Sequence, residues 1–492
     1  MQNLSQRSLG NPFLPLDTYI SDGEPHVFGD RVYLFGSQDQ EGGSVFCPLD
    51  YVCWSAPVNG LTAWRCEGTI YRREQDPRAG AFLYAPDVVR GNDGRYYLYY
   101  TTESFLEPLR VAVCDEPAGQ YQFYGLVRNP DGTPFTKRIP FDPAVINDDG
   151  TIRLYYGWGL HLGDNSINRL SMEITGRIMF GKVRDQDYSG NIMGAFTVEL
   201  AEDMLTVKTE PQLIVPCHME AKATDFAAHS FYEGSSIRKV NGKYYLIYSS
   251  QVNHELCYAI SDYPDRNFKY GGVIISNGDI GYRGRKPKDR LNTTGNNHGS
   301  IECINSQWYI FYHRHTHNRS CCRQACAEKI EILQDGSIPQ VEMTSTGLKT
   351  EPFGCGTYPA SMACNLHRGR MKHIVNGVSK ADKPCISHDQ QDRFISNVKD
   401  GTWVTFKYFN LQDAMQITAL TRGAASGVLE IYADQTLLGI LRIQPGENWQ
   451  EACTKISYDG IAALQFHYRG KERLDFLSFT IGQDQEVIED GH

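Results

Sequence analysis

Five ionisable residues stand at the same place in a phrase that the sequence repeats, and their types could carry out acid–base chemistry. Each precedes the central Leu or Ile of a tyrosine-rich apolar run by about a dozen residues; they are Asp22, Asp87, Asp142, Glu233 and His298. Two carboxyl groups facing each other across a pocket can hydrolyse a glycosidic bond, because one donates a proton to the leaving oxygen while the other activates water or attacks the sugar. A third carboxylate nearby can raise the pKa of the acid by like-charge repulsion.

The local sequence around three of these residues indicates which role each could take. Glu233 lies between bulky aromatics and small residues (FYEGSS), where partial desolvation would raise its pKa. Asp22 lies in a tight polar turn (SDGEP) that offers backbone N–H groups and keeps the carboxylate ionised. We therefore predict Asp22 as base, Glu233 as acid and Asp142 as the residue that tunes and orients the acid. The alternative is that these residues cap strand entries by bonding local backbone amides, and it applies best to Asp87.

The elements that would position these residues are β-hairpins. In each repeat a turn is followed by an apolar run, and Asp-Gly and Asn-Gly turns are strong hairpin signals because both central residues need a positive φ. The runs are 29–36, 93–100, 149–156, 241–248 and 305–312. Five hairpin units in the first two thirds of the chain predict a five-bladed β-propeller. A TIM barrel would need amphipathic helices between its strands, and the sequence has none of convincing length.

A propeller would also explain the five ionisable residues. The innermost strand of each blade begins at the same height around the axis, so equivalent positions converge on one central pocket. Gathering four carboxyls and a histidine there is costly, because buried charges lose their hydration. Structure alone gives little reason for such a cluster, so a function is the better explanation. The sequence therefore predicts a functional site on the propeller axis.

The phrases that carry these residues resemble glycoside hydrolase family 43 over roughly residues 10–345. The matching stretches are 20–25 (ISDGEP), 84–87 (YAPD), 141–144 (FDPA), 231–235 (FYEGS) and 297–301 (NHGSI). The resemblance implies a five-bladed propeller and an inverting mechanism. It also implies that Asp22 is the general base, that Asp142 adjusts the pKa of the acid and that Glu233 is the general acid.

The same resemblance suggests further site residues. The family often places a histidine at the propeller centre, bound to calcium directly or through water, and His298 matches it; a hydrogen-bonding histidine without metal is the alternative. An arginine after the last blade often holds the sugar hydroxyls, and Arg323 matches it. Tyr84 stands where the family usually has Trp, which leaves the sugar-stacking platform open. We predict Tyr84, Asp87 and Arg323 as substrate-binding residues, and no cofactor for the chemistry itself.

The repeated hairpin pattern does not continue after residue 347. Residues 1–347 form the predicted propeller, and 348–391, rich in Gly, Pro and Cys, form a predicted linker or wrapping segment. Residues 392–492 alternate short strands and turns, which predicts a jelly-roll-like β-sandwich. This part is similar to carbohydrate-binding module family 6 through 427–434 (GVLEIYAD), 449–450 and 474–479, but it lacks the Asn and the exposed aromatic near the last strand. We therefore favour a structural sandwich braced against the propeller, with a packing Trp449, over a sugar-binding module.

The composition of the chain indicates which binding partners and which cellular location to expect. The chain of 492 residues has a formal net charge of −10, which repels nucleic acid, and no apolar run long enough to span a membrane. Its first residues, Met1–Arg7, do not resemble a signal peptide, so we expect a cytoplasmic protein, or a secreted one if a signal has been removed. The 14 cysteines show no disulfide framework. His313, His315 and His317 followed by Cys321, Cys322 and Cys326 could bind a metal, but their spacing matches no zinc motif and favours a structural role.

These observations together predict an exo-acting, inverting glycoside hydrolase. The expected substrates are oligosaccharides of the plant type that end in α-L-arabinofuranosyl or β-D-xylosyl units. The alternatives are a β-D-galactofuranosidase on the same scaffold, a non-catalytic sugar-binding propeller and a metal-dependent enzyme built on the His313–Cys326 cluster. Nothing in the sequence indicates the oligomeric state.

Overall fold

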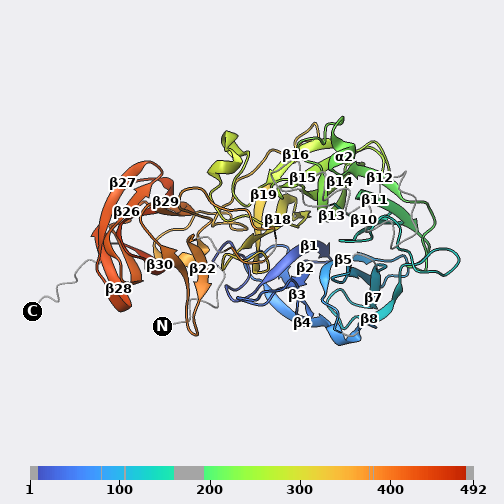
Figure 1. The fold of residues 1–492 in the computed structure, drawn as a ribbon, viewed down its shortest axis with the longest axis horizontal. Helices are drawn as coiled ribbons and strands as arrows, with labels where there is room; N and C mark the ends of the chain where they lie inside the picture. The colour runs from blue at the N-terminus through green and yellow to red at the C-terminus, as the bar shows by residue number, and fades with distance from the viewer. Residues whose placement is uncertain are drawn as a thin grey trace, which may run out of the picture.

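The computed structural model describes residues 9–483, except 79, 105–106, 160–192, 376 and 380–381. The segment Met1–Arg7, which does not resemble a signal peptide in sequence, therefore lies outside the described residues. The chain forms two β-rich bodies side by side, the N-terminal one in blue to yellow and the C-terminal one in orange and red (Figure 1). The helices in the described part of the chain are short: η2 (Arg73–Gln75), α2 (His218–Ala221), η3 (Tyr282–Gly284), η4 (Pro287–Asp289) and η5 (Ala360–Met362).

The first body is the predicted propeller, and its strands pair in sequence order within each blade. The first three blades are β1 (Ile20–Phe28), β2 (Arg31–Gln38), β3 (Tyr51–Pro57) and β4 (Arg65–Tyr71); β5 (Tyr84–Arg90), β6 (Tyr96–Thr101), β7 (Arg110–Cys114) and β8 (Gln122–Leu126); and β9 (Ala144–Asp148), β10 (Thr151–Trp158), β11 (Gly194–Leu200) and β12 (Gln212–Pro216). The last two are β13 (Phe231–Val240), β14 (Lys243–Ser250), β15 (Leu256–Ser261) and β16 (Lys269–Ile275); and β17 (Ile301–Ile304), β18 (Gln307–His315) and β19 (Arg323–Ile330).

The hairpins form where the sequence predicts them, and two contacts close the ring. In the β13–β14 turn, Asn241 and Gly242 both have positive φ (50° and 80°), as a type I′ turn requires. A parallel bridge between Gly23 and Gly299 joins the first blade to the last. Residues 11–13 run along β19, where the backbone N–H of Phe13 donates to the carbonyl of Ala325. The N-terminal segment therefore flanks the three strands of the fifth blade.

The second body is the predicted β-sandwich, made of two antiparallel sheets. One has the order β22-β23-β30-β25-β28, with β20 also paired to β30, and the other has the order β21-β24-β29-β26-β27. The strands are β20 (Gly356–Pro359), β21 (Asn365–His367), β22 (Cys385–His388), β23 (Arg393–Val398), β24 (Thr402–Asn410), β25 (Gln416–Gly423), β26 (Ser426–Ala433), β27 (Thr436–Ile443), β28 (Gly446–Lys455), β29 (Ile461–Lys471) and β30 (Leu474–Gly482).

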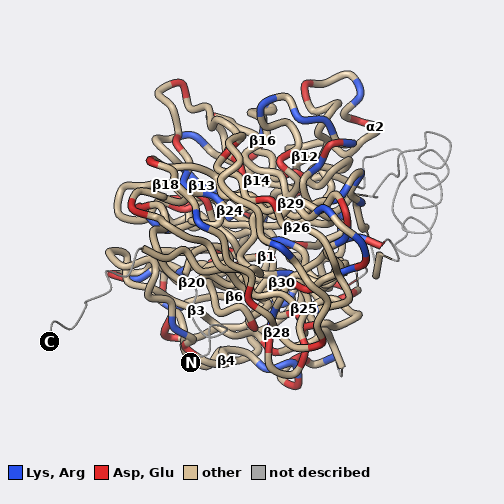
Figure 2. Tube along the Cα trace, turned by 90° about the vertical axis from the view of Figure 1, so that its left-hand side faces the viewer, with Lys and Arg blue, Asp and Glu red and all other residues tan. Residues whose placement is uncertain are grey.

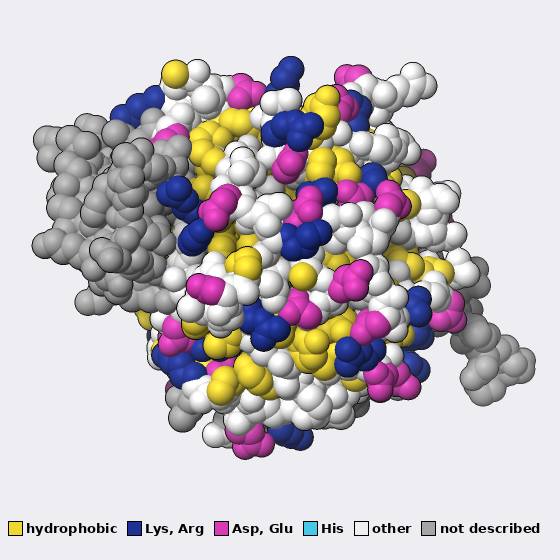
Figure 3. Space-filling model, turned by 90° about the vertical axis from the view of Figure 1, so that its right-hand side faces the viewer, with side chains coloured by type: hydrophobic (Ala, Val, Ile, Leu, Met, Phe, Trp, Pro, Cys, Tyr) yellow, Lys and Arg dark blue, Asp and Glu magenta, His cyan; other side chains and the backbone are white. Residues whose placement is uncertain are grey.

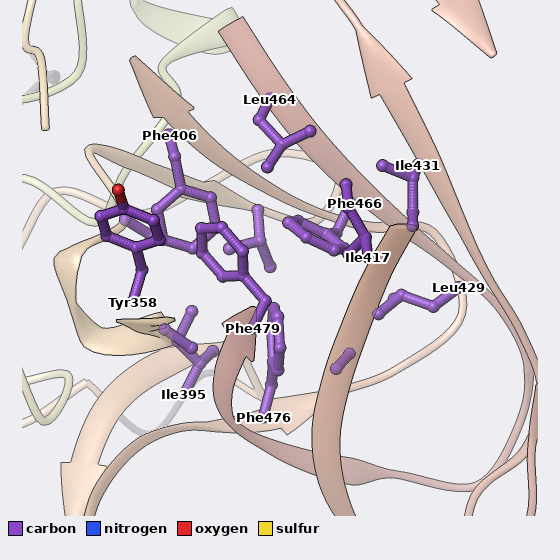
Figure 4. Close-up of a cluster of buried hydrophobic side chains, with 14 of the residues drawn as sticks. Tyr358, Ile395, Phe406, Ile417, Leu429, Ile431, Leu464, Phe466, Phe476 and Phe479 are labelled. Carbon is purple, nitrogen blue, oxygen red and sulfur yellow. The ribbon is translucent and has the colours of Figure 1, made fainter. Parts of the chain in front are cut away.

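Aromatic rings fill the space between the two sheets (Figure 4). Phe406, Phe466 and Phe476 are almost fully buried, and each has its ring centroid within 6.4 Å of the ring of Phe479. Trp449 packs at the sheet surface instead, where it contacts Phe394 and Arg422 and donates its indole N–H to Asp392. This arrangement agrees with a packing role for the tryptophan.

The segment 348–391, predicted as a linker or wrapping segment, adds three short strands, β20, β21 and β22, to the sheets of the sandwich. It also ties the two bodies together. Buried Arg314, near the end of β18 in the propeller, donates hydrogen bonds to the carbonyls of Ala363 and Ser361. In the other direction, Leu16 from the N-terminal segment packs into the core of the sandwich. Sequence composition shows Gly, Pro and Cys here but does not show where short strands pair.

Charges of both signs are interspersed over the surface. The view onto the sandwich shows short basic and acidic stretches alternating along the trace (Figure 2), and the opposite face shows acidic and basic side chains next to each other among small apolar patches (Figure 3). Neither view shows a continuous basic stripe of the kind that follows a phosphate backbone. No helix in the described part of the chain has the length and apolarity needed to cross a membrane.

Candidate active site

Four of the five repeated ionisable residues meet in one cavity of about 240 Å³. The cavity is smaller than a pocket for a drug-sized ligand, which is about 300–1,000 Å³, and so suits a single small ring. Aromatic side chains make up much of its wall. Its lining comprises Asp22, Phe46, Cys47, Tyr84, Ala85, Phe141, Asp142, Trp158, Tyr232, Glu233, Asn296, His298, Arg323 and Val375.

Asp22, in β1, is held as a carboxylate. One of its oxygens lies 2.8 Å from Nη1 of Arg323, and its backbone N–H donates to Nδ1 of His313 at 3.3 Å. Burial on its own would raise the pKa of Asp22, but Arg323, His313 and His298 outweigh that effect and lower the pKa to about 2. Asp22 has φ of 54°, in the left-handed region that non-glycine residues seldom adopt outside turns and functional sites.

Arg323, at the start of β19, is buried and has its guanidinium oriented by a second acid. Its Nε and Nη2 atoms donate to the two carboxylate oxygens of Asp39 at 2.8 and 3.0 Å, which is a bidentate ion pair. Its guanidinium also lies 5.0 Å from the ring centroid of Phe46. Arg323 therefore lines the cavity as predicted and, in addition, orients the Asp22 carboxylate.

Glu233 lies in β13, where two irregularities interrupt the pairing with β14, one on each side of it. Such bulges re-aim a side chain relative to the regular pleat. Desolvation raises the pKa of Glu233, the negative charge of Asp22 raises it further, and the pKa reaches about 8 although Arg323 and a hydrogen bond from Trp158 oppose the shift. Glu233 is therefore protonated at neutral pH.

Asp142, just before β9, contacts the segment that carries Glu233. Its Oδ2 accepts the backbone N–H of Gly234 at 3.0 Å and lies 3.8 Å from Nδ1 of His298. Burial raises the pKa of Asp142 well above its usual range, and the charges of Glu233 and Asp22 raise it further. Asp142 is thus placed both to orient the Glu233 segment and to interact electrostatically with the acid.

His298 lines the cavity and lies between Asp22 and Glu24. Its Nδ1 lies 4.0 Å from Oδ1 of Asp22, and its Nε2 lies 3.9 Å from Oε1 of Glu24 on the other side. Both Nε2 of His298 and Oε1 of Glu24 are buried, and neither has a hydrogen-bond partner within the described protein. Burial, followed by the charge of Asp87, raises the pKa of Glu24 to about 8. An orphaned carboxylate oxygen facing an orphaned imidazole nitrogen could hold a water molecule or a cation.

The structure does not place Asp87 as the predicted substrate-binding residue. It is not among the cavity-lining residues, and its two oxygens are taken by Nε2 of His26, the N–H of Val88 and the N–H of Val145, each at 2.7 Å. Asp87 precedes its apolar run by one residue less than Asp22 and Asp142 do, and neighbouring strand residues point to opposite sides. Its role here is the alternative considered above, a carboxylate that caps backbone amides. Tyr84, by contrast, lines the cavity with its ring 6.1 Å from that of Phe141.

The residues of the predicted His–Cys cluster lie in different surroundings and do not form one site. His313 contacts the backbone of Asp22, whereas Nε2 of His317 bonds Nδ1 of His388 in the sandwich at 2.8 Å. In the described part of the chain, the only groupings suited to metal ligation are Glu41–His317–His388 and Glu24–His26–Asp87, and neither includes a cysteine. Glu41 is already paired with Arg393 through two hydrogen bonds. None of the fourteen cysteines, all of which lie in the described part of the chain, forms a disulfide.

Several cavity residues escaped the sequence analysis. Trp158 stands two residues after the end of the third tyrosine-rich run, so an aromatic at that place in the repeat is a signal that could have been used. Asn296 precedes the predicted His298 by two residues and binds Nε2 of His315 through its side chain. Val375 belongs to no repeat and carries no signal of this kind.

The cavity thus joins a carboxylate kept ionised, a carboxylic acid kept protonated, a third carboxyl next to the acid and an aromatic wall, which together can perform acid–base hydrolysis of a glycosidic bond. Residues 11–338 match the model of glycosyl hydrolases family 43. The chain belongs to this family. It is a glycoside hydrolase, and hydrolysis in this family proceeds with inversion. The family match ends before the sandwich, so the similarity of that domain to carbohydrate-binding module family 6 stays a prediction.

This chain is similar in sequence to a curated relative and similar in fold to solved structures. The chain is 44% identical over 494 residues to a xylosidase/arabinosidase of Thermoclostridium stercorarium, which covers 96% of this chain and 99% of the relative. A family 43 arabinoxylan arabinofuranohydrolase of Bacillus subtilis, solved with cellotetraose, is 20% identical to this chain. The match covers 96% of this chain and 97% of the other chain, with a TM-score of 0.50. A β-xylosidase/α-arabinofuranosidase from a compost metagenome, solved with xylotriose in a calcium-free form, is 25% identical over 68% of this chain and 98% of its own, with a TM-score of 0.51.

Proposed function

We propose that this family 43 glycoside hydrolase acts at the ends of oligosaccharides and releases single α-L-arabinofuranosyl or β-D-xylosyl units. The observation that carries the proposal is the opposite protonation of Asp22 and Glu233 in one small cavity, with pKa values of about 2 and about 8. A cavity of about 240 Å³ suits one sugar ring, which favours cleavage at a chain end over cleavage within a chain.

In the proposed reaction the protonated Glu233 donates its proton to the oxygen that leaves the sugar. Asp22 removes a proton from the water that attacks the opposite face of the anomeric carbon, so the configuration inverts. After each turnover Glu233 is ionised and Asp22 is protonated, and exchange with solvent restores both. Arg323 and Asp39 hold the Asp22 carboxylate in place, and the aromatic rings of Tyr84 and Trp158 offer faces on which the C–H surface of a sugar can pack.

The relatives favour a pentose at the cleaved end. Two curated relatives that match over 60% or more of this chain are both xylosidase/arabinosidases, from Thermoclostridium stercorarium at 44% identity and from Bacteroides ovatus at 30% identity. A hexofuranose such as galactofuranose is therefore not favoured. A non-catalytic sugar-binding propeller is also not favoured, because Asp22, Asp142 and Glu233 are all present in the cavity.

We further propose that a calcium ion can occupy the propeller axis next to the cavity. Calcium binds oxygen at about 2.3–2.6 Å, so two ligands 3.9 Å apart can share one ion. Glu24 would supply the oxygen and His298 the nitrogen, with water completing the shell. The ion would add positive charge beneath Asp22 and Asp142 and would brace the site, while the proton transfers stay with Asp22 and Glu233.

A screen of p-nitrophenyl α-L-arabinofuranoside, β-D-xyloside and β-D-galactofuranoside tests the proposed function. We expect turnover of at least one of the two pentosides and loss of that turnover in Asp22→Ala, with Asp149→Ala, an exposed turn substitution far from the cavity, as the control. Turnover of the galactofuranoside alone, or of none of the three, would contradict the proposal.

A further inference from the structure

We propose that the segment Met371–Val375, here called the strap, forms the wall of the cavity over the fifth blade, and that Val375 limits which terminal sugars the cavity accepts. The strap lies outside residues 11–338, which match the family, so the family motifs do not predict it. The inference rests on the proposed function, because it concerns the sugar that the same cavity binds.

The strap is fixed to the propeller on both sides of Val375. Before it, the N–H of Thr294 donates to the carbonyl of Lys372 at 3.0 Å, and the N–H of Ile374 donates to the carbonyl of Thr294 at 2.7 Å. After it, Gly377 exchanges two hydrogen bonds with Ser320, at 2.9 and 3.0 Å. Thr294 and Ser320 both belong to connections of the fifth blade. The path of the strap is therefore set by the propeller and is not that of a free linker.

The strap also contacts the side of the cavity that carries the general acid. The ring of His373 packs edge-on against His254 with centroids 4.7 Å apart, and His254 stacks on Tyr232 at 4.6 Å and 5°. Tyr232 lines the cavity and immediately precedes Glu233. Nδ1 of His373 also bonds the hydroxyl of Thr294 at 2.9 Å, which fixes the orientation of its ring. The strap thus packs against the wall next to the residue that protonates the leaving group.

Val375 is the strap residue that reaches the cavity. It is half-buried and lines the space together with Asn296, which precedes β17 of the fifth blade. Its branched apolar side chain can pack against the C–H face of a sugar, but a hydroxyl placed against it would lose its hydrogen bond to water without a replacement. A hexose differs from the matching pentose by an added hydroxymethyl group. Val375 therefore discriminates against a sugar that carries this group towards the strap.

Two pairs of substrates test this inference, because each pair differs only by the hydroxymethyl group. They are the p-nitrophenyl β-D-xyloside and β-D-glucoside, and the α-L-arabinofuranoside and β-D-galactofuranoside. In Val375→Ala we expect the hexoside-to-pentoside ratio of kcat/KM to rise by roughly tenfold in the pair with the better pentoside, mainly through KM of the hexoside. In Val375→Phe we expect KM for that pentoside to rise.

The matched control is Val378→Ala, because Val378 follows the strap by three residues but is 48% exposed and is not among the cavity-lining residues. This variant should leave the ratio unchanged. The alkaline limb of the pH profile should also stay in place in both Val375 variants, because neither substitution adds or removes a charge next to Glu233. Folding is checked by the thermal unfolding midpoint of each variant.

An unchanged ratio in Val375→Ala together with an unchanged pentoside KM in Val375→Phe, in folded protein, would overturn the inference. A change of equal size in Val378→Ala would overturn it as well, because it would show a loss of order in the segment instead of a role of one side chain. A wild-type protein that cleaves neither pentoside would contradict the proposed function itself, and the inference would then fall with it.

Discussion

At the scale of single residues, the site depends on how differently two buried carboxyls are surrounded. Asp22 lies 2.8 Å from the guanidinium of Arg323, which keeps it ionised. Glu233 is desolvated and faces the negative charge of Asp22, which keeps it protonated. Each residue therefore starts the reaction in the protonation state that its proposed role requires, and no conformational change is needed to set that state.

The pKa of Glu233 predicts the pH dependence of turnover. The general acid must carry its proton, so kcat/KM should fall as the pH rises through about 8, the pKa of Glu233. The tuning role of Asp142 requires that its carboxyl ionise before Glu233 and repel the Glu233 carboxylate, so under that role Asp142→Asn should move this alkaline limb to lower pH. Initial rates across the pH range measure the shift. An alkaline limb that stays in place would show that Asp142 only orients the acid through its hydrogen bond to Gly234.

The sequence predicted these side chains to different degrees. Asp22, Asp142 and His298 stand twelve residues before the central Leu or Ile of their runs, and a propeller brings such equivalent positions together. Glu233 stands thirteen residues before its Leu, and the additional register shift in the pairing of β13 takes up the extra residue. Asp87 shows the limit of that argument, because a shift of one residue along a strand turns a side chain to the other face. Arg323 was predicted to hold the sugar, but its bidentate pairing with Asp39 depends on two segments far apart in the chain that only the fold brings together.

At the scale of elements, β13 shows how backbone irregularity serves the site. Gly234 has φ of 75°, and a Cβ added there would lie 3.2 Å from the ring of His298. A regular strand would not admit this conformation for most residues, and the irregular pairing around Glu233 depends on it. The sequence shows the glycine and its small neighbours, but it does not show that the pairing shifts there.

Gly234→Ala should therefore lower both stability and activity. The positive φ costs an L-residue roughly 1–2 kcal/mol, and the new methyl group would press on His298. The matched control is Gly242→Ala, whose φ of 80° is similar but whose Cβ would meet no atom within 4 Å. Urea unfolding should show a similar loss for both variants, whereas kcat should fall only for Gly234→Ala. Equal kcat in the two variants would contradict a role of this position in the site.

At the scale of the whole molecule, the propeller and the sandwich are parts of one packed structure. Lys407 of the sandwich strand β24 lies 2.7 Å from Glu342 and 3.4 Å from buried Asp279, both in segments that follow propeller strands. Leu16 packs into the sandwich core, and its carbonyl accepts a hydrogen bond from Gln324 of β19 at 2.7 Å. The sequence predicted a propeller followed by a β-sandwich, but composition could not show that the segment between them would add strands to both sheets of the sandwich and one residue to the cavity wall.

Leu16→Ala should show that the two bodies unfold together. Truncating a buried leucine costs about 2–5 kcal/mol, because the cavity it leaves is only partly refilled. If the bodies are coupled, calorimetry should show a single transition that moves as a whole to lower temperature. Leu333→Ala, at a position 44% exposed, serves as the control and should change little. A separate early transition for the sandwich would contradict the coupling.

The assignment of Glu233 as the general acid and Asp22 as the base is the central claim of the mechanism, and the dependence on the leaving group tests it most directly. The measurement compares kcat/KM of wild type and Glu233→Ala on the p-nitrophenyl pentoside and on the disaccharide with the same terminal sugar. A p-nitrophenolate leaves with little protonation, whereas a sugar alkoxide needs the proton, so we predict a loss of about 10²–10⁴-fold on the disaccharide and a much smaller loss on the aryl substrate. An equal loss on both substrates would contradict the assignment of Glu233 as the proton donor.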